Sequence, residues 1–519
     1  MKKFGAFIII IAIIFLLALN ICGVFALRTA KELKEKKDMV KQSEVVLYEG
    51  PRSLRDAVAE DLENVSEDKR DYSLLHCTDT FVTVNGQECY VYDTNVNHTR
   101  SWYGNYLPPQ SRTPVAIFDF EGAVDVEVRV PDRELDKVKI SPLSAGIEPQ
   151  INKDAHTVSF RLVTPGNYTL QFDDSPERAL HIFTNHIEKE EDKPDPQDPN
   201  VICFGPGEWT VDSLSLSKGQ TLYLAGGCVL HTNVNANFIS DVKVCGRGIL
   251  DGSAYECWKG REAYVPLKFG HCKGTEIRDI VVLNSNAWVV EAYDCEDGVI
   301  DGLRIISSRP NGDGMSIQSC AHYKISNCFV RSWDDSLVVK NYDLNSDDIV
   351  FRDMQLWTDL AQSMEIGFET NKGKKPNATI TNVTFEDITV LNNYHKPVIS
   401  VHNADDALVE DILFRNIVVE HEEVGSGDSD LPYLIDIGVV QNNNWSSTPE
   451  RGQIRGVSLE NVNFMEGNDK YSRIAGFDAE HIVDDVTVKG LVMFGNEVRD
   501  ADEAKIKISE NTVGSVKFE

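Results

Sequence analysis

The chain has 519 residues, of which 42% are hydrophobic and 26% charged, and its formal net charge at pH 7 is -31. This composition excludes a wholly disordered chain, and the length allows two or three domains, or one long repeat domain plus a smaller one. The acidic balance excludes nucleic acid as a partner, because phosphate binding needs a basic surface. It also disfavours a strongly anionic polysaccharide, unless a local basic cleft overrides the average.

The first segment, residues 1–27, carries Lys2 and Lys3 followed by an uncharged apolar stretch. A basic start before an apolar block predicts a signal peptide, and the stretch is also long enough to act as a retained membrane anchor. Both alternatives place the protein outside the cytoplasm, either secreted or tethered to the outer face of the cytoplasmic membrane. Residues 28–71 begin with a charged, helix-favouring stretch, and we expect them to form a spacer.

Residues 72–187 contain short runs of alternating apolar and polar residues, such as FVTVNGQECYVYD and VDVEVRVPD, separated by turn residues. This pattern is typical of an antiparallel β-sandwich-like domain. Residues 188–200, with the sequence EKEEDKPDPQDPN, are charged and proline-rich, and we interpret them as a linker.

Residues 201–519 repeat a short unit, in which a polar turn residue precedes four or five residues rich in β-branched and aromatic side chains. The first strand residues Ile280, Leu303, Cys328 and Met354 lie 23, 25 and 26 residues apart. A period in the low twenties without a helical pattern predicts a parallel β-solenoid, and it disfavours a β-propeller with longer repeats. Later intervals are longer, which indicates insertions on one face, where binding loops usually lie.

The eleven cysteines do not have the spacing of a disulfide framework. Cys272, Cys295 and Cys320 are 23 and 25 residues apart, in step with the repeat, so we expect them to stack as thiols inside the solenoid. The sequence contains no metal-ligand or nucleotide-binding motif, and we therefore predict neither a cofactor nor a metal site.

Two acidic segments lie in the most regular part of the repeat, Asn311-Gly312-Asp313-Gly314 and Trp333-Asp334-Asp335-Ser336. Asp313 and Asp334 are 21 residues apart, about one coil, so they are expected on adjacent coils roughly 4.8 Å apart. Carboxylates this close raise at least one pKa, and a protonated acid beside an ionised one can protonate a glycosidic oxygen while activating water. Because neighbouring residues of a flat strand face opposite sides, Asp334 and Asp335 need a bend or bulge. The alternative is that these aspartates only cap turns.

These motifs resemble those of polygalacturonases and the related dextranases and isopullulanases, which carry an N-x-D-G motif and, one coil later, a D-D motif. FGPG (204–207), LYLAGG (222–227) and RDIVVLNSNAW (278–288) match as well. The resemblance implies an all-β fold of the pectin-lyase-like type, a right-handed parallel β-helix preceded by a smaller antiparallel β-sandwich-like domain. It also implies a glycosidase that inverts the anomeric centre, with Asp334 as general acid and with Asp313 and Asp335 holding and deprotonating the water.

The chain departs from polygalacturonases at the motifs that follow. Ala361-Gln362-Ser363 stands in place of their G-H-G motif, and Val398-Ile399-Ser400-Val401 stands in place of the R-I-K motif that binds the substrate carboxylate. Since this carboxylate clamp is missing, we expect a neutral glycan of dextran type. The run Glu365-x-Gly367-Phe368 is similar to the Q-x-G-W run of dextranases. Together with the aspartates, the predicted substrate-binding residues are Asn311, Trp333, Lys340, Tyr342, Gln362 and Glu365.

Three alternatives remain open. One is a polygalacturonase acting on pectin. Another is a polysaccharide lyase, for which Lys340 is the obvious proton acceptor, and the third is a carbohydrate-binding solenoid without catalysis. Phe368 could stack on a sugar ring, whereas Trp288 is expected in the core and His402 is expected to be structural.

Overall fold

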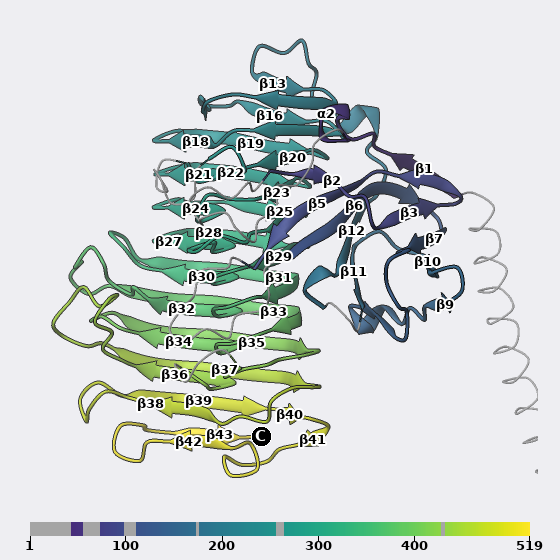
Figure 1. Cartoon of the computed structure of the whole chain (residues 1–519). Helices are drawn as coiled ribbons and strands as arrows, with labels where there is room; N and C mark the ends of the chain where they lie inside the picture. Colours follow the sequence, from purple (N-terminus) through teal and green to yellow (C-terminus); the bar gives the residue numbers. More distant parts are fainter. Residues whose placement is uncertain (1–42, 56–72, 98–110, 173–175, 256–263, 427–430) are drawn as a thin grey trace, which may run out of the picture.

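The computed structural model describes residues 43–55, 73–97, 111–172, 176–255, 264–426 and 431–519. The predicted signal peptide or anchor and most of the predicted spacer lie outside these ranges. Among the described residues, no helix combines the length and apolar character that a membrane crossing requires. The chain forms a tall stack of β-coils with a smaller pair of sheets packed against its upper half (Figure 1).

The smaller part consists of two sheets. The first contains β1 (Glu44–Leu47), β2 (Leu75–His76), β5 (Val91–Val96), β6 (Ser111–Glu121), β8 (Val138–Ser141), β11 (Asn167–Phe172) and β12 (Leu180–Asn185). The second contains β3 (Phe81–Val84), β4 (Gln87–Cys89), β7 (Val124–Arg129), β9 (Gln150–Asn152) and β10 (Thr157–Leu162). Their pairing is antiparallel except that β12 runs parallel to β6. The helix α2 (Arg52–Arg55) and short 3-10 helices at Leu143–Ala145, Pro176–Arg178 and Glu190–Asp192 complete this region.

Alternation along the strands explains why this region forms a sandwich. In β7 the side chains of Val124, Val126 and Val128 are buried and those between them are exposed. Phe118 and Phe120 of β6 meet these valines in one core between the two sheets. Strand β1 pairs with β6, so the sandwich begins within the stretch expected to be a spacer, earlier than residue 72.

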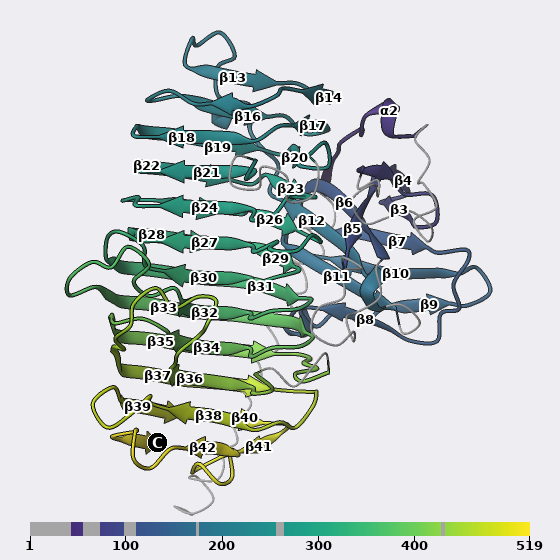
Figure 2. The ribbon, with the colours of Figure 1, turned by 60° about the vertical axis from the view of Figure 1, so that its left-hand side comes forward.

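The described coils of residues 201–519 form a right-handed parallel β-helix with two long sheets (Figure 2). The strands of the 20-stranded sheet are β13 (Val201–Phe204), β14 (Gly207–Thr210), β16 (Thr221–Leu224), β17 (Cys228–His231), β19 (Ser240–Gly246), β20 (Ile249–Asp251), β22 (Lys273–Arg278), β23 (Val281–Leu283), β25 (Val299–Asp301), β26 (Arg304–Ile306), β28 (Ala321–Ser326), β29 (Phe329–Ser332), β31 (Ser346–Thr358), β33 (Thr379–Asn393), β35 (Leu408–Val419), β37 (Gln453–Phe464), β39 (Val483–Lys489), β40 (Val492–Met493), β41 (Asn496–Glu497) and β43 (Val516–Phe518). The strands of the 11-stranded sheet are β15 (Leu214–Ser215), β18 (Val234–Asn237), β21 (Leu267–Gly270), β24 (Val290–Tyr293), β27 (Met315–Gln318), β30 (Leu337–Lys340), β32 (Met364–Phe368), β34 (Ile399–Asn403), β36 (Ile435–Val439), β38 (Ser472–Ala475) and β42 (Ile506–Ile508).

The polar turn residue of each repeat has a specific backbone role. Asp279, Asn327, Asp353, Asp387 and Asn416 all have φ between 54° and 59°, in the left-handed region. Asp and Asn tolerate this conformation better than other residues with a Cβ atom. The residue therefore lets the chain turn a corner at the same place in each coil, which explains its regular spacing in the sequence.

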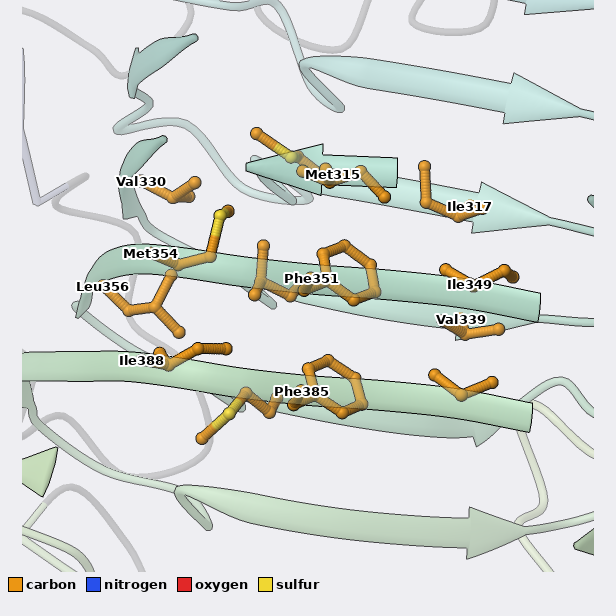
Figure 3. Packing of buried hydrophobic residues seen from close by; sticks show 14 of the residues in the cluster. Met315, Ile317, Val330, Val339, Ile349, Phe351, Met354, Leu356, Phe385 and Ile388 are labelled. Carbon is orange, nitrogen blue, oxygen red and sulfur yellow. The ribbon is translucent and has the colours of Figure 1, made fainter. Parts of the chain in front are cut away.

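Identical positions on successive coils pack on one another inside the β-helix. The rings of Phe351, Phe385 and Phe414 stack with centroids 4.9 Å apart and planes within 4° of parallel. Figure 3 shows Phe351 above Phe385, with the aliphatic side chains around them. Because the register repeats from coil to coil, the core is continuous along the whole described stack.

The predicted cysteine ladder is confirmed. Cys272, Cys295 and Cys320 are buried free thiols in the interior of the β-helix. The amide of Cys272 lies 3.4 Å from Cys295 Sγ, and the amide of Cys295 lies 3.4 Å from Cys320 Sγ.

Buried arginines from three coils fasten the sandwich to the 20-stranded sheet. Arg247 Nε donates to Asp119 Oδ2 at 2.8 Å, and Arg304 Nε donates to Asn167 Oδ1 at 2.9 Å. Arg331 Nη2 donates to the carbonyl oxygen of Glu177 at 2.9 Å. An apolar cluster shared by both parts surrounds these contacts, so the interface leaves the 11-stranded sheet uncovered by the sandwich (Figures 1 and 2).

Candidate active site

A cleft lies on the outward face of the 11-stranded sheet, over β27, β30 and β32. The three predicted catalytic residues, Asp313, Asp334 and Asp335, line it together. Four of the predicted substrate-binding residues also line it, namely Asn311, Lys340, Tyr342 and Gln362. The parallel coils therefore bring together these seven side chains from three consecutive coils of the β-helix.

Coil register places the aspartates at one level. Asp313 precedes β27 and Asp335 precedes β30, each by two residues, and Met315 pairs with Leu337 in register. The amide of Gly314 donates to the carbonyl oxygen of Asp335 at 2.8 Å. A Cβ atom at Gly314 would lie 2.5 Å from the Ser336 carbonyl oxygen. Only glycine lets the two coils approach this closely beside Asp313.

The chain bends at Trp333 and Asp334, between β29 and β30, as their adjacent carboxylates require. The Ser332 hydroxyl donates to the carbonyl oxygen of Asp334 at 2.7 Å, and the Asp335 amide donates to Asp334 Oδ1 at 3.0 Å. The backbone N–H of Gln362, on the next coil, donates to Asp335 Oδ1 at 3.1 Å. Both side chains are thereby fixed toward the cleft by backbone groups, and both are partly exposed.

A chain of hydroxyls holds this bend from below. Ser332 and Ser336 are 2.7 Å apart, Ser336 and Thr358 are 2.7 Å apart, and Thr358 and Ser363 are 2.7 Å apart, measured between the side-chain oxygens. All four residues are buried. The bend is thus part of a hydrogen-bonded chain that links two adjacent coils.

The electrostatics of the cleft favour protonated carboxyls. Burial, and then the neighbouring Asp334, raise the pKa of Asp313 well above its usual value and that of Asp335 to about 8. Burial also raises the pKa of Asp334. Because the three groups interact, they titrate as a set rather than singly. At neutral pH the set therefore keeps at least one proton.

One buried ammonium opposes these shifts. Lys340 Nζ lies 3.9 Å from Asp313 Oδ2 and 3.3 Å from Glu369 Oε2, and its charge lowers the pKa of all three aspartates. Burial lowers the pKa of Lys340 itself, but Glu369 and Asp313 outweigh burial and raise it well above the usual value. Lys340 therefore stays charged and favours the ionised form of part of the set.

Two predicted substrate-binding residues do not line the cleft. Glu365 is fully buried, and its carboxylate bonds with the Ser400 hydroxyl and lies 2.9 Å from His402 Nδ1, so it is not in the cleft lining. Trp333 is also buried and does not line the cleft. Conversely, Trp288 is not in the core, since it lines the cleft with Lys340 Nζ 5.5 Å from its ring centroid.

Glu365 begins a buried ionic row on the outward face of the sheet, formed by Glu365, His402, Asp436 and Arg473. His402 Nε2 lies 3.0 Å from Asp436 Oδ2, and Arg473 Nε donates to Asp436 Oδ1 at 2.8 Å. Burial lowers the pKa of His402, but the two carboxylates outweigh burial and raise it to about 10. The ring of Phe368 stacks on His402 at 4.4 Å and lines the cleft. The row therefore supports an aromatic wall of the cleft.

Sequence reasoning missed several other residues in the cleft lining, namely Glu369, Lys372, Lys396 and Trp445. Trp445 lies in the connection between β36 and β37, one of the long intervals that indicated insertions. The interval was therefore a usable signal, although it could not identify the residue.

The family model for glycosyl hydrolases family 28 matches residues 225–512. The chain belongs to glycosyl hydrolases family 28. The match includes every residue of the cleft lining, so the family assignment applies to the part of the chain that carries the candidate active site.

Curated relatives of this family 28 chain include a probable endopolygalacturonase D of Neosartorya fischeri, 25% identical over 51% of this chain and 58% of that protein. A probable polygalacturonase of Vitis vinifera is 24% identical over 41% of this chain and 46% of that protein. The chain thus spans about half the length of these relatives. The solved structure of Dex49A from Penicillium minioluteum covers 92% of this chain and 98% of its own, with a TM-score of 0.58 and 11% identity, which shows a common fold.

Replacing His402 by Ala should lower the free energy of unfolding by about 3–5 kcal/mol, because Glu365 would stay buried without a cation and Asp436 would keep only Arg473. The pKa of His402 in the folded protein, about 10, lies above the usual histidine value of 6.5 that applies to the unfolded chain, so the stabilisation is complete below pH 6.5 and is lost as pH rises through about 10. Urea midpoints at acidic and alkaline pH measure this loss. The exposed His322→Ala serves as control, and an unchanged midpoint for His402→Ala at acidic pH would contradict the prediction.

Proposed function

We propose that the cleft hydrolyses a glycosidic bond of a polysaccharide with inversion, Asp334 acting as general acid and Asp313 and Asp335 binding and deprotonating the water. The observation that supports this most is the sharing of one buried ammonium among three carboxyls on two adjacent coils. An inverting glycosidase needs one protonated and one ionised carboxyl on opposite sides of the bond. Because the three carboxyls have raised pKa values and titrate as one set, the set can hold a protonated carboxyl beside an ionised one, and the resemblance to polygalacturonases assigns the proton to Asp334.

The hydrogen bonds around the aspartates support the assignment of roles. Asp334 Oδ1 accepts the Asp335 amide, so Oδ2 is the oxygen that would carry the proton to the glycosidic oxygen. Asp335 Oδ1 accepts the Gln362 amide, and Asp313 Oδ1 has no hydrogen-bond partner within the described ranges. As the glycosidic bond breaks, the water oxygen attacks the anomeric carbon and its proton passes to one of these two carboxylates. Asn311, Tyr342 and Gln362 would contact the bound sugar.

We further propose a neutral glycan of dextran type as substrate, hydrolysed outside the cytoplasm. Ser400 and His402 are the outward-facing residues of β34, in the place of the missing R-I-K motif. The Ser400 hydroxyl bonds with Glu365, and His402 lies between two carboxylates beneath Phe368. Strand β34 therefore offers no cation to a substrate carboxylate.

A second candidate is a galacturonate chain. The curated relatives are named polygalacturonases, and Lys340, Lys372 and Lys396 line the cleft. Their ammonium groups could attract an anionic chain, as a basic cleft on an acidic protein would.

Replacement of Asp334 by Asn removes the proton but keeps the shape, so hydrolysis should fall by about 10²–10⁴. New reducing ends from dextran, pullulan, galactan and polygalacturonate identify the best substrate and measure the loss on it. An aryl glycoside with an activated leaving group needs little protonation, so the same variant should lose much less on it. Asp335→Asn should be impaired on both substrates, and exposed Asp348→Asn on neither. Full activity of Asp334→Asn would rule out the assignment.

Replacement of Lys340 by Met should move the pH profile of kcat/KM to higher pH. Lys340 lowers the pKa of Asp313, Asp334 and Asp335, so without its charge the water-activating carboxylates ionise only at higher pH. The acid keeps its proton to higher pH for the same reason. Initial rates between pH 4 and pH 9 report the shift, with exposed Lys324→Met as control. If the pH profile of kcat/KM did not move, Lys340 would not be the group that lowers these pKa values.

A further inference from the structure

We propose that the catalytic cleft continues into a groove over the preceding coils, and that a row of aromatic side chains there binds several further units of a neutral polysaccharide. This inference rests on the proposed function and extends it from the bond that is cleaved to the chain that carries it.

The groove lies over β18, β21 and β24 and is continuous with the cleft. Trp288, Tyr342 and Lys372 line both hollows, so no wall separates them. From β18 to β30 the sheet advances by four strand spacings, which is roughly 19 Å. A ligand that fills both hollows must therefore be an extended chain rather than a single sugar.

His271, Tyr293 and Tyr342 line this groove, and the exposed ring of Phe238, stacked on His271, extends the aromatic row beyond it. The rings of Phe238 and His271 stack with centroids 4.2 Å apart, and those of His271 and Tyr293 meet edge to face at 5.2 Å. Tyr293 and Tyr342 follow at 5.9 Å. The row thus leads without a gap from β18 to the catalytic cleft.

The coil geometry puts these rings at one edge of the sheet. Phe238 directly follows β18 and His271 directly follows β21, and both have the same left-handed backbone, with φ of 55° and 52°. Phe238 is 73% exposed, the largest exposure among the described large apolar side chains. An exposed phenyl ring that continues an aromatic row beside a glycosidase cleft can cover the apolar face of a sugar ring.

One buried polar side chain between the groove and the catalytic cleft, that of Gln318, has polar atoms without a hydrogen-bond partner among the described residues. Gln318 of β27 lies in register between Tyr293 and Lys340, on the face opposite to the core residue Ile317. It is completely buried, yet neither Oε1 nor Nε2 has a hydrogen-bond partner in the part of the chain that the structure describes. Such groups are usually satisfied by an ordered water, which here could bridge to a sugar hydroxyl.

The charges along the row favour a neutral chain. Lys268 Nζ lies 3.1 Å from Glu291 Oε2, and His271 Nδ1 lies 3.5 Å from Asp294 Oδ2. Asp343, a further carboxylate, bonds with the hydroxyl of Tyr293. With Lys372, which lines both hollows, the row has two ammonium groups, Lys268 and Lys372, and three carboxylates, Glu291, Asp294 and Asp343, so one acid is in excess. A polyanion would meet repulsion here, whereas the hydroxyls and apolar faces of a neutral glycan would not.

Native electrophoresis of the full chain through gels containing dextran, pullulan, galactan or polygalacturonate tests the groove without requiring turnover. At least one neutral polysaccharide should retard the protein. Phe238→Ala and Tyr293→Ala should each weaken this binding about threefold to tenfold, the range expected for loss of one aromatic contact. Phe238→Tyr should restore it. Trp209 is 44% exposed and lies on the 20-stranded sheet, away from the groove, so the control variant Trp209→Ala should bind like the wild type.

Hydrolysis of a small aryl glycoside, which occupies only the cleft, should stay within twofold of wild type in Phe238→Ala. The proposed binding in the groove would be contradicted if both alanine variants were retarded like the wild type. It would also be contradicted if no neutral polysaccharide retarded the protein. Retardation by polygalacturonate alone would contradict the proposal that the bound polysaccharide is neutral. These outcomes differ from failure of the proposed function, which full activity of Asp334→Asn would reveal whatever the gels show.

Discussion

The in-register parallel pairing of one coil with the next is the constraint on which the site depends. A single hydrogen bond of this ladder, from the Gly314 amide to the Asp335 carbonyl oxygen, holds two carboxylates from consecutive coils at one level. Neither coil has an active site alone, and the same pairing stacks Phe351, Phe385 and Phe414 in the core behind the cleft. The sandwich stiffens this stack through buried arginines on the 20-stranded sheet and leaves the catalytic sheet free. The same strand register therefore packs the core and assembles the candidate active site.

Two sets of buried charges lie on neighbouring coils and behave in opposite ways. In the buried ionic row, His402 and Arg473 balance Glu365 and Asp436, and each charge has a partner at hydrogen-bond distance. In the cleft, the carboxyls of Asp313, Asp334, Asp335 and Glu369 face one buried ammonium, that of Lys340, while Lys372 and Lys396 line the cleft from more exposed positions, so the four acids outnumber the three lysines. Burial of carboxyl groups without an equal number of neighbouring cations raises their pKa values, so that a carboxyl can keep a proton for acid catalysis at neutral pH. The matched row is accordingly structural, and the unmatched set is suited to catalysis.

Much of the fold could be predicted from the sequence, because the β-helix rests on local rules that repeat. The left-handed Asp and Asn corners and the cysteines at coil spacing are visible in any one repeat. The bend at Asp334 followed from the need to point adjacent carboxylates the same way. Burial on the outward face could not be predicted, since period-two alternation assigns Glu365 to the cleft side without revealing that Phe368 and His402 enclose it. Trp445 and Lys372 lie in connections whose paths depend on distant coils, and the aromatic row joins residues from coils far apart in sequence.

The central claim is that water attacks the anomeric carbon directly while Asp334 protonates the departing oxygen. Nuclear magnetic resonance of the first-formed product, recorded before the new reducing end changes its anomeric form, tests this claim most directly. The account predicts that this end has the configuration opposite to that of the cleaved bond, because a single displacement inverts the centre. A product that keeps the original configuration would require a covalent intermediate and would contradict the account, as would an unsaturated end produced by a lyase.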